Sequence, residues 1–296
     1  MNEREVNTLI VGAGYSGLNT YYAVNKEAHV VSMDNVFKFR TAELRKIVNT
    51  GIKSEVPVPF VAKNKVLDID VSSRLAVLEG EKIYAENLVI TPGCLRSNWG
   101  KVIENALSSS YISLGTEDEK DEYLLLQLAF YLKKIGKNVR IQTSYLKWLG
   151  EPVESIVRSL ADQVGISYTE RPEFIIEECV PSHPFSFYQP NEFMEIADRV
   201  YVAGDIVKGW PKLGELAMRT GMYVGKRING FSRSFEPIFI FILDAGNGFG
   251  LHIRSNKPWG GNLVSVKGSR IRPLLKRFIE RYYIWTKGRM GFLVNL

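Results

Sequence analysis

The chain has 296 residues, of which 45% are hydrophobic and 24% charged, so it can bury one large core or two moderate ones and is not disordered. The formal net charge is +6, yet no nucleic-acid motif accompanies the basic residues, so we expect no nucleic-acid partner. Two cysteines and three scattered histidines argue against a disulfide framework, a zinc-ligand cluster and a histidine-rich metal site, so we expect no metal.

The sequence also argues against export and against a membrane span. Residues 1–8 are polar and charged, unlike a secretory signal peptide. No apolar run approaches the ~18 residues that a spanning helix needs. We therefore expect a cytoplasmic protein, attached at most peripherally to the inner face of the cell membrane.

The first predicted element is a buried strand at residues 7–11, which leads into a glycine-rich turn. The turn has the GxGxxG pattern and consists of Gly12, Ala13, Gly14, Tyr15, Ser16 and Gly17. In a dinucleotide site, Gly12 allows the tight turn, Gly14 lets a pyrophosphate approach the backbone, and Gly17 lets the next helix pack on the strand. A helical pattern follows the turn, as such a site requires.

A second predicted strand, residues 28–33, ends at Asp34. This carboxylate stands about 20 residues after the turn, where a dinucleotide site has the group that accepts hydrogen bonds from the adenosine ribose. The strand, turn, helix and acid together predict a dinucleotide site. A glycine turn that only packs against its neighbours is the alternative.

Two later predicted strands, residues 82–93 and 199–205, end in turns that add candidate residues: Thr91, Pro92, Gly93, Gly204 and Asp205. Taken singly, each is an ordinary core strand that ends in a turn. Together and in this order, the motifs resemble those of the two-dinucleotide-binding-domain flavoproteins, the FAD-dependent pyridine nucleotide-disulfide oxidoreductase superfamily. In that family the aspartate of the last motif, here Asp205, reaches the ribityl chain and pyrophosphate region of FAD. The resemblance therefore implies FAD as the cofactor.

Further segments resemble two branches of that superfamily, the sulfide:quinone oxidoreductases and the type II NADH dehydrogenases. These segments are residues 35–48, 97–100, 211–228 and 239–253. The resemblance is strong over residues 6–34 and 199–228 and weak elsewhere. It implies a quinone as the electron acceptor and a place at the membrane surface.

The predicted helix at residues 211–228 resembles the one whose N-terminus faces the pyrimidine ring of the flavin. A reduced flavin carries negative charge there, and the backbone N–H groups of a helix N-terminus stabilise such charge. We expect Leu213, Gly214 and Glu215 at that position. Lys212 either adds Coulomb attraction or is a solvated lysine that precedes the helix.

A second strand–turn–helix pattern occupies residues 111–126, YISLGTEDEKDEYLLL. In the family that the chain resembles, a second Rossmann unit inserted here binds NAD(P)H through its own glycine-rich turn. The turn in this chain instead carries five carboxylates, which oppose a phosphate: Glu117, Asp118, Glu119, Asp121 and Glu122. Such residues also favour a helix N-terminus. On either interpretation we expect no complete NAD site.

The two cysteines match none of the sulfur-carrying positions of the sulfide enzymes. Cys94 follows the turn at residues 91–93, and Cys179 lies within residues 173–180. Free cysteines are most often small buried hydrophobes, and we expect that role for both. Because strand ends point at the ligand in this fold, a Cys94 close to the cofactor is the alternative.

The C-terminal stretch, residues 267–289, has a helical pattern with two different faces. Apolar residues recur at Ile271, Leu274, Leu275, Phe278, Ile279, Tyr282 and Trp285. The remaining face is basic, with Arg270, Arg272, Lys276, Arg277, Arg281 and Lys287. This pattern is typical of a helix in a membrane interface, and the apolar residues 290–296 would deepen the anchor. Packing of the apolar face on the body of the protein, or on a second copy in a homo-oligomer, is the alternative.

The expected fold class is α/β. A Rossmann-like FAD-binding domain in two segments, residues 1–100 and 180–235, holds a reduced second Rossmann-like domain, residues 101–179, the degenerate NAD-type domain. A C-terminal β-hairpin and amphipathic helix occupy residues 236–296. The expected function is a FAD-dependent oxidoreductase that passes electrons from an unidentified donor to a quinone, with no catalytic residue identified. A non-catalytic FAD-binding partner subunit or redox sensor is the alternative, favoured by the missing NAD turn and the apparent lack of a cysteine pair.

Overall fold

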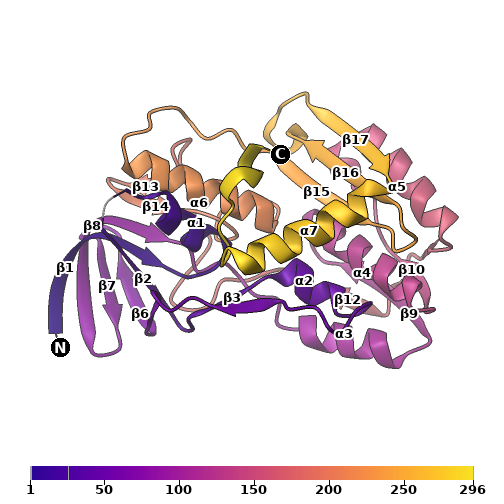
Figure 1. Cartoon of the computed structure of the whole chain (residues 1–296), viewed down its shortest axis with the longest axis horizontal. Coiled ribbons are helices and arrows are strands. Elements are labelled where there is room, and N and C mark those ends of the chain that lie inside the picture. The colour runs from indigo at the N-terminus through magenta and orange to yellow at the C-terminus, as the bar shows by residue number, and fades with distance from the viewer. Residues whose placement is uncertain (1, 26, 296) are drawn as a thin grey trace.

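The computed structural model describes residues 2–25 and 27–295, which form four sheets with helices packed among them (Figure 1). The largest sheet has the strand order β13-β14-β8-β1-β2-β5, and β7 joins it through β8 and carries β6 at its edge. Its strands are β1 (Asn2–Val11), β2 (Ala28–Ser32), β5 (Ala62–Lys63), β6 (Val66–Asp70), β7 (Leu75–Leu78), β8 (Glu81–Ile90), β13 (Glu195–Ala197) and β14 (Val200–Val202).

The centre of this sheet is parallel and buried, as the apolar run at residues 8–11 predicts. Strand β1 pairs in parallel with β2 and β8, and the side chains of Leu9 and Ile10 are fully buried. The strand begins at Asn2 and not at residue 7, because its polar first half pairs with β8 from Glu81 onward. Parallel strands place their carboxyl ends on one edge, so the turns after β1, β8 and β14 lie close together.

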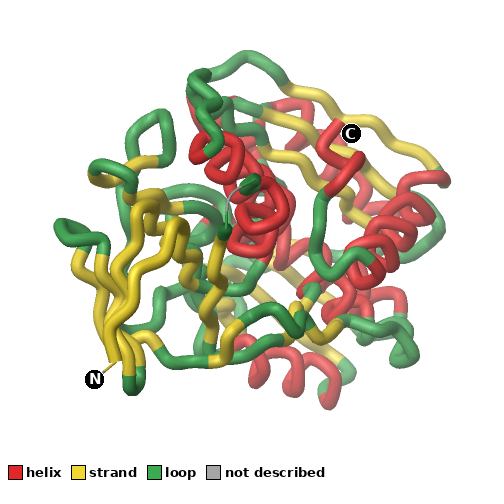
Figure 2. The backbone as a smooth tube through the Cα atoms, turned by 60° about the vertical axis from the view of Figure 1, so that its left-hand side comes forward, coloured by secondary structure: helices red, strands yellow, loops and turns green. Residues whose placement is uncertain are grey.

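Helices cover this sheet, and short elements connect it to the rest of the chain. Helix α1 packs closely against α6, because glycines at the crossing leave room for the neighbouring backbone. The elements are α1 (Tyr15–Ala23), α6 (Gly214–Ile228), α2 (Arg40–Arg45), α3 (Trp99–Ser108), β3 (Val36–Lys38) and β4 (Glu55–Pro57). Figure 2 shows the strands of the large sheet gathered on the side where the chain begins.

The inserted unit has a four-stranded parallel sheet in the order β11-β10-β9-β12. Its helix α4 is buried along most of its length, including Leu125, Leu128 and Leu132, so it lies in the core and not on the surface. The elements are β9 (Tyr111–Thr116), η1 (Glu119–Asp121), α4 (Glu122–Lys134), β10 (Asn138–Ile141), η2 (Lys147–Leu149), α5 (Glu151–Gln163), β11 (Ser167–Tyr168) and β12 (Phe174–Ile176).

The C-terminal region contains the expected β-hairpin, β15 and β16, and a third strand extends it to an antiparallel sheet. The additional strand β17 pairs with β16 along residues 250–255. The strands are β15 (Phe239–Asp244), β16 (Gly250–Ser255) and β17 (Val264–Ser269), followed by α7 (Ile271–Trp285); short helices η3 (Lys257–Trp259) and η4 (Gly291–Asn295) complete the chain. Figure 1 shows α7 lying across the molecule between the large sheet and the inserted unit. Leu296, the last residue of the predicted tail, lies outside the described residues.

The predicted apolar face of α7 divides between two environments. Ile271, Leu274, Phe278 and Trp285 are 51–80% exposed, and we call these four residues the outer stripe. Leu275 and Ile279 instead line a cavity inside the protein. Among residues 2–25 and 27–295, no helix is both long enough and apolar enough to span a bilayer.

Candidate cofactor and substrate site

One cavity of about 1010 Å³ brings most of the predicted site residues together. It extends from the glycine-rich turn, past the first turn of α6, to the space between α7 and the C-terminal sheet. Its volume is at the upper end of the usual range for small-molecule sites. The predicted residues that line it are Gly12, Gly14, Tyr15, Ser16, Asp34, Thr91, Pro92, Gly93, Asp205, Lys212, Leu213 and Gly214. Gly17 and Gly204 do not line it and act through packing.

The glycines of the first turn have different physical roles. Gly12 has φ +107°, and a Cβ there would lie 2.3 Å from the carbonyl oxygen of Thr91. A Cβ on Gly17 would lie 1.9 Å from the carbonyl oxygen of Gly12, so this position must also lack a side chain. A Cβ on Gly14 would meet nothing within 4 Å. Because Gly14 borders the cavity at the N-terminus of α1, the free space there fits a pyrophosphate.

Asp34 and Thr91 flank this turn. The Thr91 hydroxyl donates to the carbonyl oxygen of Val11 at 2.9 Å, so its first role is to join β8 to β1. Asp34 accepts from Lys38 Nζ at 2.9 Å. Burial acts to raise the pKa of Asp34, but Lys38 and the backbone N–H of Val36 outweigh it and keep the carboxyl pKa below its ordinary value. Asp34 is thus ionised and half-exposed at the cavity, which suits an acceptor for ribose hydroxyls.

Asp205 is held at the cavity by the turn after β14. Gly204 has φ +80°, and a Cβ there would lie 2.5 Å from Ser16 Oγ, so the two turns are in contact. Burial raises the pKa of Asp205 to about 6, although Lys212 and Arg96 act to lower it. No hydrogen bond of the described residues engages the Asp205 carboxylate, so its oxygens are available to hydroxyl donors of a ligand.

Lys212, just before α6, is not the solvated lysine of one sequence interpretation. Its side chain is buried, and its Nζ donates to the carbonyl oxygen of Val207 at 2.8 Å. The same ammonium lies 4.4 Å from the ring centroid of Phe187. Burial lowers the Lys212 pKa, and Asp205 opposes that change. The positive charge is therefore fixed beside the cavity and does not move freely in solvent.

The first turn of α6 faces the glycine-rich turn across the cavity. A Cβ on Gly214 would lie 3.2 Å from the ring of Tyr15, so Tyr15 closes the space next to this helix end. The Tyr15 hydroxyl accepts from the backbone N–H of Arg40 at 2.7 Å. Glu215 forms an ion pair with Arg219, and its Oε2 is buried without a partner among the described residues. Burial raises the pKa of Glu215 to about 7.

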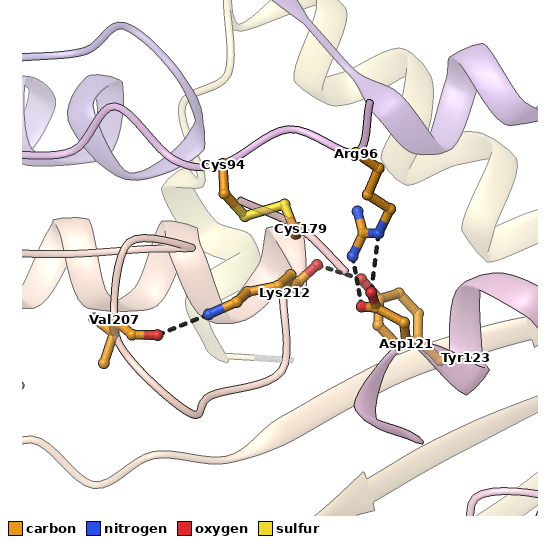
Figure 3. The surroundings of a disulfide bond; sticks show 7 residues. All are labelled: Cys94, Arg96, Asp121, Tyr123, Cys179, Val207 and Lys212. Carbon is orange, nitrogen blue, oxygen red and sulfur yellow. Dashed lines mark hydrogen bonds and ion pairs between the residues drawn. A yellow bond between two sulfur atoms is a disulfide. The ribbon is translucent and has the colours of Figure 1, made fainter. Parts of the chain in front are cut away.

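The cysteines form a disulfide, which corrects the expectation of two separate buried thiols (Figure 3). The Cα atoms of Cys94 and Cys179 are 5.4 Å apart. The backbones of Leu95 and Val180 pair beside them, with both N–H to carbonyl hydrogen bonds at 2.9 Å. Cys94 borders the cavity, whereas Cys179 is only 2% exposed. The pair was missed because no local spacing links residues that only the fold brings together.

Polar side chains of three other segments surround the disulfide. In Figure 3, Lys212 lies below it, and Arg96 and Asp121 lie beside it. Arg96 Nε donates to Asp121 at 2.9 Å, and both side chains are largely buried. The inserted unit therefore contributes its acidic turn to the wall of the site, through an ion pair.

The other carboxylates of the acidic turn, except the exposed Glu119, are also bound by the protein itself. Asp118 Oδ1 accepts from the backbone N–H of Lys120 at 2.9 Å. The buried Glu122 accepts from the Ser144 hydroxyl at 2.8 Å and from the backbone N–H of Leu146 at 2.9 Å. Glu122 thereby fastens α4 to the loop that follows β10. Glu122 lies in the first turn of α4, as the helix N-terminus interpretation expects, but neither interpretation predicted these hydrogen bonds.

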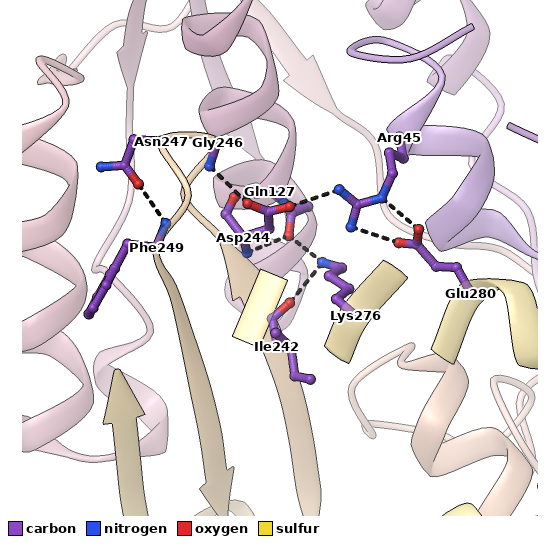
Figure 4. Close-up of polar contacts among 9 residues, drawn as sticks. All are labelled: Arg45, Gln127, Ile242, Asp244, Gly246, Asn247, Phe249, Lys276 and Glu280. Carbon is purple, nitrogen blue, oxygen red and sulfur yellow. Dashed lines mark hydrogen bonds and ion pairs between the residues drawn. The ribbon is translucent and has the colours of Figure 1, made fainter. Parts of the chain in front are cut away.

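A buried polar network beside the cavity holds α7 in place (Figure 4). Arg45 of α2 forms ion pairs with Glu280 of α7 at 2.5 Å and with Asp244 of β15 at 2.8 Å. Lys276 is 4% exposed and donates to Gln127 and, at 2.7 Å, to the carbonyl oxygen of Ile242. The expectation of Lys276 on a solvent-facing basic face is therefore wrong, because the helix turns that position toward α4.

No protein-family model and no curated protein matches the sequence of this chain. Solved structures, in contrast, are similar to it in fold. Sulfide:quinone oxidoreductase from the hyperthermophilic bacterium Aquifex aeolicus is similar with a TM-score of 0.78 and 16% identity, over 98% of this chain and 93% of that one. NADH:rubredoxin oxidoreductase from Clostridium acetobutylicum is similar with a TM-score of 0.62 and 17% identity, over 84% and 82%. A NAD-dependent persulfide reductase from A. fulgidus gives 0.61 and 13%, over 84% and 64%. The chain therefore has the predicted α/β fold, which it shares with these oxidoreductases.

Proposed function

We propose that the protein is a FAD-dependent oxidoreductase whose Cys94–Cys179 disulfide is redox-active. The first turn, with open space at Gly14, would hold the pyrophosphate, and Asp34 and Asp205 would accept from hydroxyls of the cofactor. Bound FAD would supply two-electron redox chemistry, while the protein supplies binding, orientation and charge. The observation that carries the proposal is that the disulfide opens on the same cavity as these residues.

The position of the two sulfurs favours a sulfur compound as the electron donor. A hydrosulfide or thiolate would attack Cys94 Sγ, the cysteine that borders the cavity. A bond forms between the donor sulfur and Cys94, the disulfide bond breaks, and Cys179 leaves as a thiolate that carries the electron pair. The donor sulfur is oxidised and the protein disulfide is reduced. The positive charges of Arg96 and Lys212, which lie around the disulfide in Figure 3, would stabilise the thiolate.

Two further considerations support a sulfur donor over a nicotinamide. In the turn of the inserted unit, Asp118 occupies the backbone N–H of Lys120, and the carboxylates place negative charge where a pyrophosphate would lie. Two of the similar structures are a sulfide:quinone oxidoreductase and a persulfide reductase, although the latter and a third neighbour also use NAD or NADH. The non-catalytic alternative rested on the missing NAD turn and on the lack of a cysteine pair. The disulfide removes the second of these reasons.

The test is reduction of the FAD-loaded protein by hydrosulfide, followed anaerobically in a stopped-flow instrument. Cys94→Ser and Cys179→Ser should each slow flavin bleaching by at least about 100-fold, because neither variant retains a disulfide to attack. Ser182→Ala, which alters another residue of the cavity lining, should leave the rate unchanged. Flavin content should be equal in all four proteins.

The possible results separate the candidate functions. Bleaching by hydrosulfide at the same rate in both cysteine variants would remove the disulfide from the reaction. Rapid bleaching by NADH would overturn the assignment of the donor. A FAD-loaded protein that neither donor reduces would favour the non-catalytic subunit or sensor.

We further propose that the acceptor is a quinone, which reaches the protein at a membrane surface. The outer stripe of α7 exposes four large apolar side chains, and the exposed Arg277 and Arg281 lie on the same helix. A helix with this pattern is typical of one in the interface of an anionic bilayer. The inner edge of the helix, at Leu275 and Ile279, borders the cavity, so a quinone could pass from the bilayer to the site.

Cosedimentation with vesicles that contain anionic phospholipid tests the membrane proposal. The double variant Phe278→Ser and Trp285→Ser should lower the partition coefficient at least tenfold, because each ring buried in lipid contributes about 1.5–3 kcal/mol. Tyr168→Ser, which removes an exposed ring elsewhere, is the matched control. High salt should weaken but not abolish binding. If the wild-type protein ignores vesicles and light scattering shows a dimer that the double variant lacks, the stripe joins two copies instead.

A further inference from the structure

The C-terminal sheet presents one face to the core and the other to the cavity. Phe239, Leu243, Leu251 and Ile253 pack in the core, and the alternate positions point the opposite way. Those alternate positions line the cavity: Ile240, Ile242, His252, Arg254, Ser265 and Lys267. Strand register makes His252 and Lys267 direct neighbours, as are Arg254 and Ser265. With Arg272, Leu275 and Ile279 of α7, this face encloses what we call the sheet arm of the cavity.

The sheet arm combines an apolar floor with cations that have no partner. Arg254, Lys267 and Arg272 make no side-chain hydrogen bond or ion pair in the part of the chain that the structure describes, and Arg254 Nε is buried without an acceptor. A buried donor left unpaired is costly, so it indicates a group that a ligand satisfies. The floor is formed by Ile240, Ile242, Leu275 and Ile279.

Two carboxylates near the sheet arm pair with cations outside it. Glu280 pairs with Arg45, and Glu215 pairs with Arg219 through Oε1, while Glu215 Oε2 is buried without a partner among the described residues. The cations of the sheet arm also act on His252. Burial, together with the charges of Arg272, Arg254 and Lys267, lowers the pKa of its imidazole to about 4. The three cations near this imidazole repel further positive charge, and a bound anion would relieve that repulsion.

We propose that the sheet arm binds an apolar ligand that carries one acidic group, a carboxylate, sulfonate or phosphate. The apolar part lies on the aliphatic floor, and the acidic group accepts from Arg254, Arg272 and Lys267. This assignment deepens the proposed function, on which it rests, by giving the electron acceptor or a lipid beside it an acidic substituent. Guanidinium groups suit such anions because they donate two parallel hydrogen bonds.

The test uses redox-inert probes, so it requires no turnover. Isothermal titration of the FAD-loaded protein compares 2-naphthoate with its neutral counterpart 2-naphthamide, and decanoate with decanamide. At least one acid should bind tenfold or more tightly than its amide, because hydrogen bonds to charged groups exceed those to neutral ones. A preference in the ring pair identifies an aromatic acceptor, and one in the chain pair identifies a lipid.

Substitutions locate the preference. Arg254→Gln, Lys267→Gln and Arg272→Gln should each reduce the ratio of acid to amide affinity at least threefold, with the largest loss for Arg254, whose Nε is buried without an acceptor. Lys257→Gln removes an exposed charge near the same sheet but outside the cavity and should change nothing. Affinity for the amides should stay within about twofold in every variant, because the aliphatic floor is intact.

A second readout is the imidazole of His252, one of only three histidines in the chain. Bound acid should raise its pKa, followed by NMR, and bound amide should not. Equal affinities of the wild-type protein for acid and amide in both pairs would overturn the proposal, even if hydrosulfide still reduces the flavin. A protein that prefers acids but is not reduced would overturn the proposed donor and leave the sheet arm as assigned.

Discussion

The two strand–turn–helix units of this chain have the same architecture and opposite turns. After β1, the turn at Gly14 leaves open space and lies at a helix end whose first N–H groups have no intrahelical acceptor. After β9, Asp118 occupies the backbone N–H of Lys120, and Glu122 accepts from the loop after β10. The scaffold alone therefore does not make a nucleotide site. The first turn keeps its space and its donors free for a ligand. The second turn is a structural joint, because its carboxylates accept hydrogen bonds from the turn itself and from the loop after β10.

Glu122→Ala is the sharpest test of the structural joint. The substitution removes three hydrogen bonds to a buried carboxylate and leaves the N–H groups of Ser144 and Leu146 without acceptors. The free energy of unfolding should fall by about 3 kcal/mol, measured by urea denaturation. Affinity for FAD should be unchanged, because the first turn is untouched.

Glu119→Ala is the matched control, since Glu119 is exposed in the same turn and its side chain accepts no hydrogen bond among the described residues. Its effect should stay within about 0.5 kcal/mol. Equal stabilities of the two variants would mean that the acidic turn is not a joint. A Glu122→Ala protein that gains affinity for NADH would mean that the carboxylate only blocks a working site.

Gly14→Val should have the opposite effects to Glu122→Ala: the stability should be nearly unchanged and the affinity for FAD should fall. The new side chain enters space that is open in the protein alone, so stability should change by less than about 1 kcal/mol. The same side chain would occupy the place of the pyrophosphate, so FAD should bind at least about 100-fold more weakly, a loss of roughly 2.7 kcal/mol. Flavin fluorescence titration measures the affinity, with Gly51→Val in a surface turn as the control. A yellow Gly14→Val protein with full flavin content would contradict the assignment.

Asp205→Asn tests whether the first site keeps an unpaired carboxylate for its ligand. Burial raises the folded-state pKa to about 6, above the ordinary 3.8, so the folded protein holds this proton more tightly than the unfolded chain. Stability from this group is present at low pH and is lost as pH rises from about 4 to about 6. The flavin-free variant should therefore be more stable than wild type at pH 7, by about 1 kcal/mol because the cavity gives the carboxylate partial access to solvent.

At pH 4 the two flavin-free proteins should unfold at nearly the same denaturant concentration. The variant should also bind FAD more weakly, because an amide is a poorer acceptor than a carboxylate. A variant that is less stable at pH 7 would show that Asp205 has a structural partner and is not held free for a ligand.

The first turn could be predicted from sequence because its requirements are local. A side chain on Gly12 would collide with the backbone of Thr91, and one on Gly17 would collide with the backbone of Gly12. The GxGxxG spacing reveals this constraint in the sequence. Lys276 shows the limit of periodicity. Helical spacing placed it among exposed arginines, and only the approach of α4 and β15 makes it a buried donor.

The cysteine pair could not be found from spacing, because Cys94 and Cys179 follow strands of two different sheets. One signal was present: each cysteine comes a few residues after the carboxyl end of a parallel strand, β8 or β12. In this fold such ends converge on the ligand. The cations of the sheet arm had a similar signal, since His252 and Arg254 alternate with apolar residues along β16.

Titration of the flavin-free protein with FAD and, separately, with NADH tests the contrast between the two turns most directly. We expect one FAD bound per chain and no saturable binding of NADH up to ~1 mM, a concentration that detects even weak complexes. Gly14→Val should abolish the FAD signal and leave the NADH trace flat. Saturable NADH binding, or FAD binding that Gly14→Val does not weaken, would contradict it.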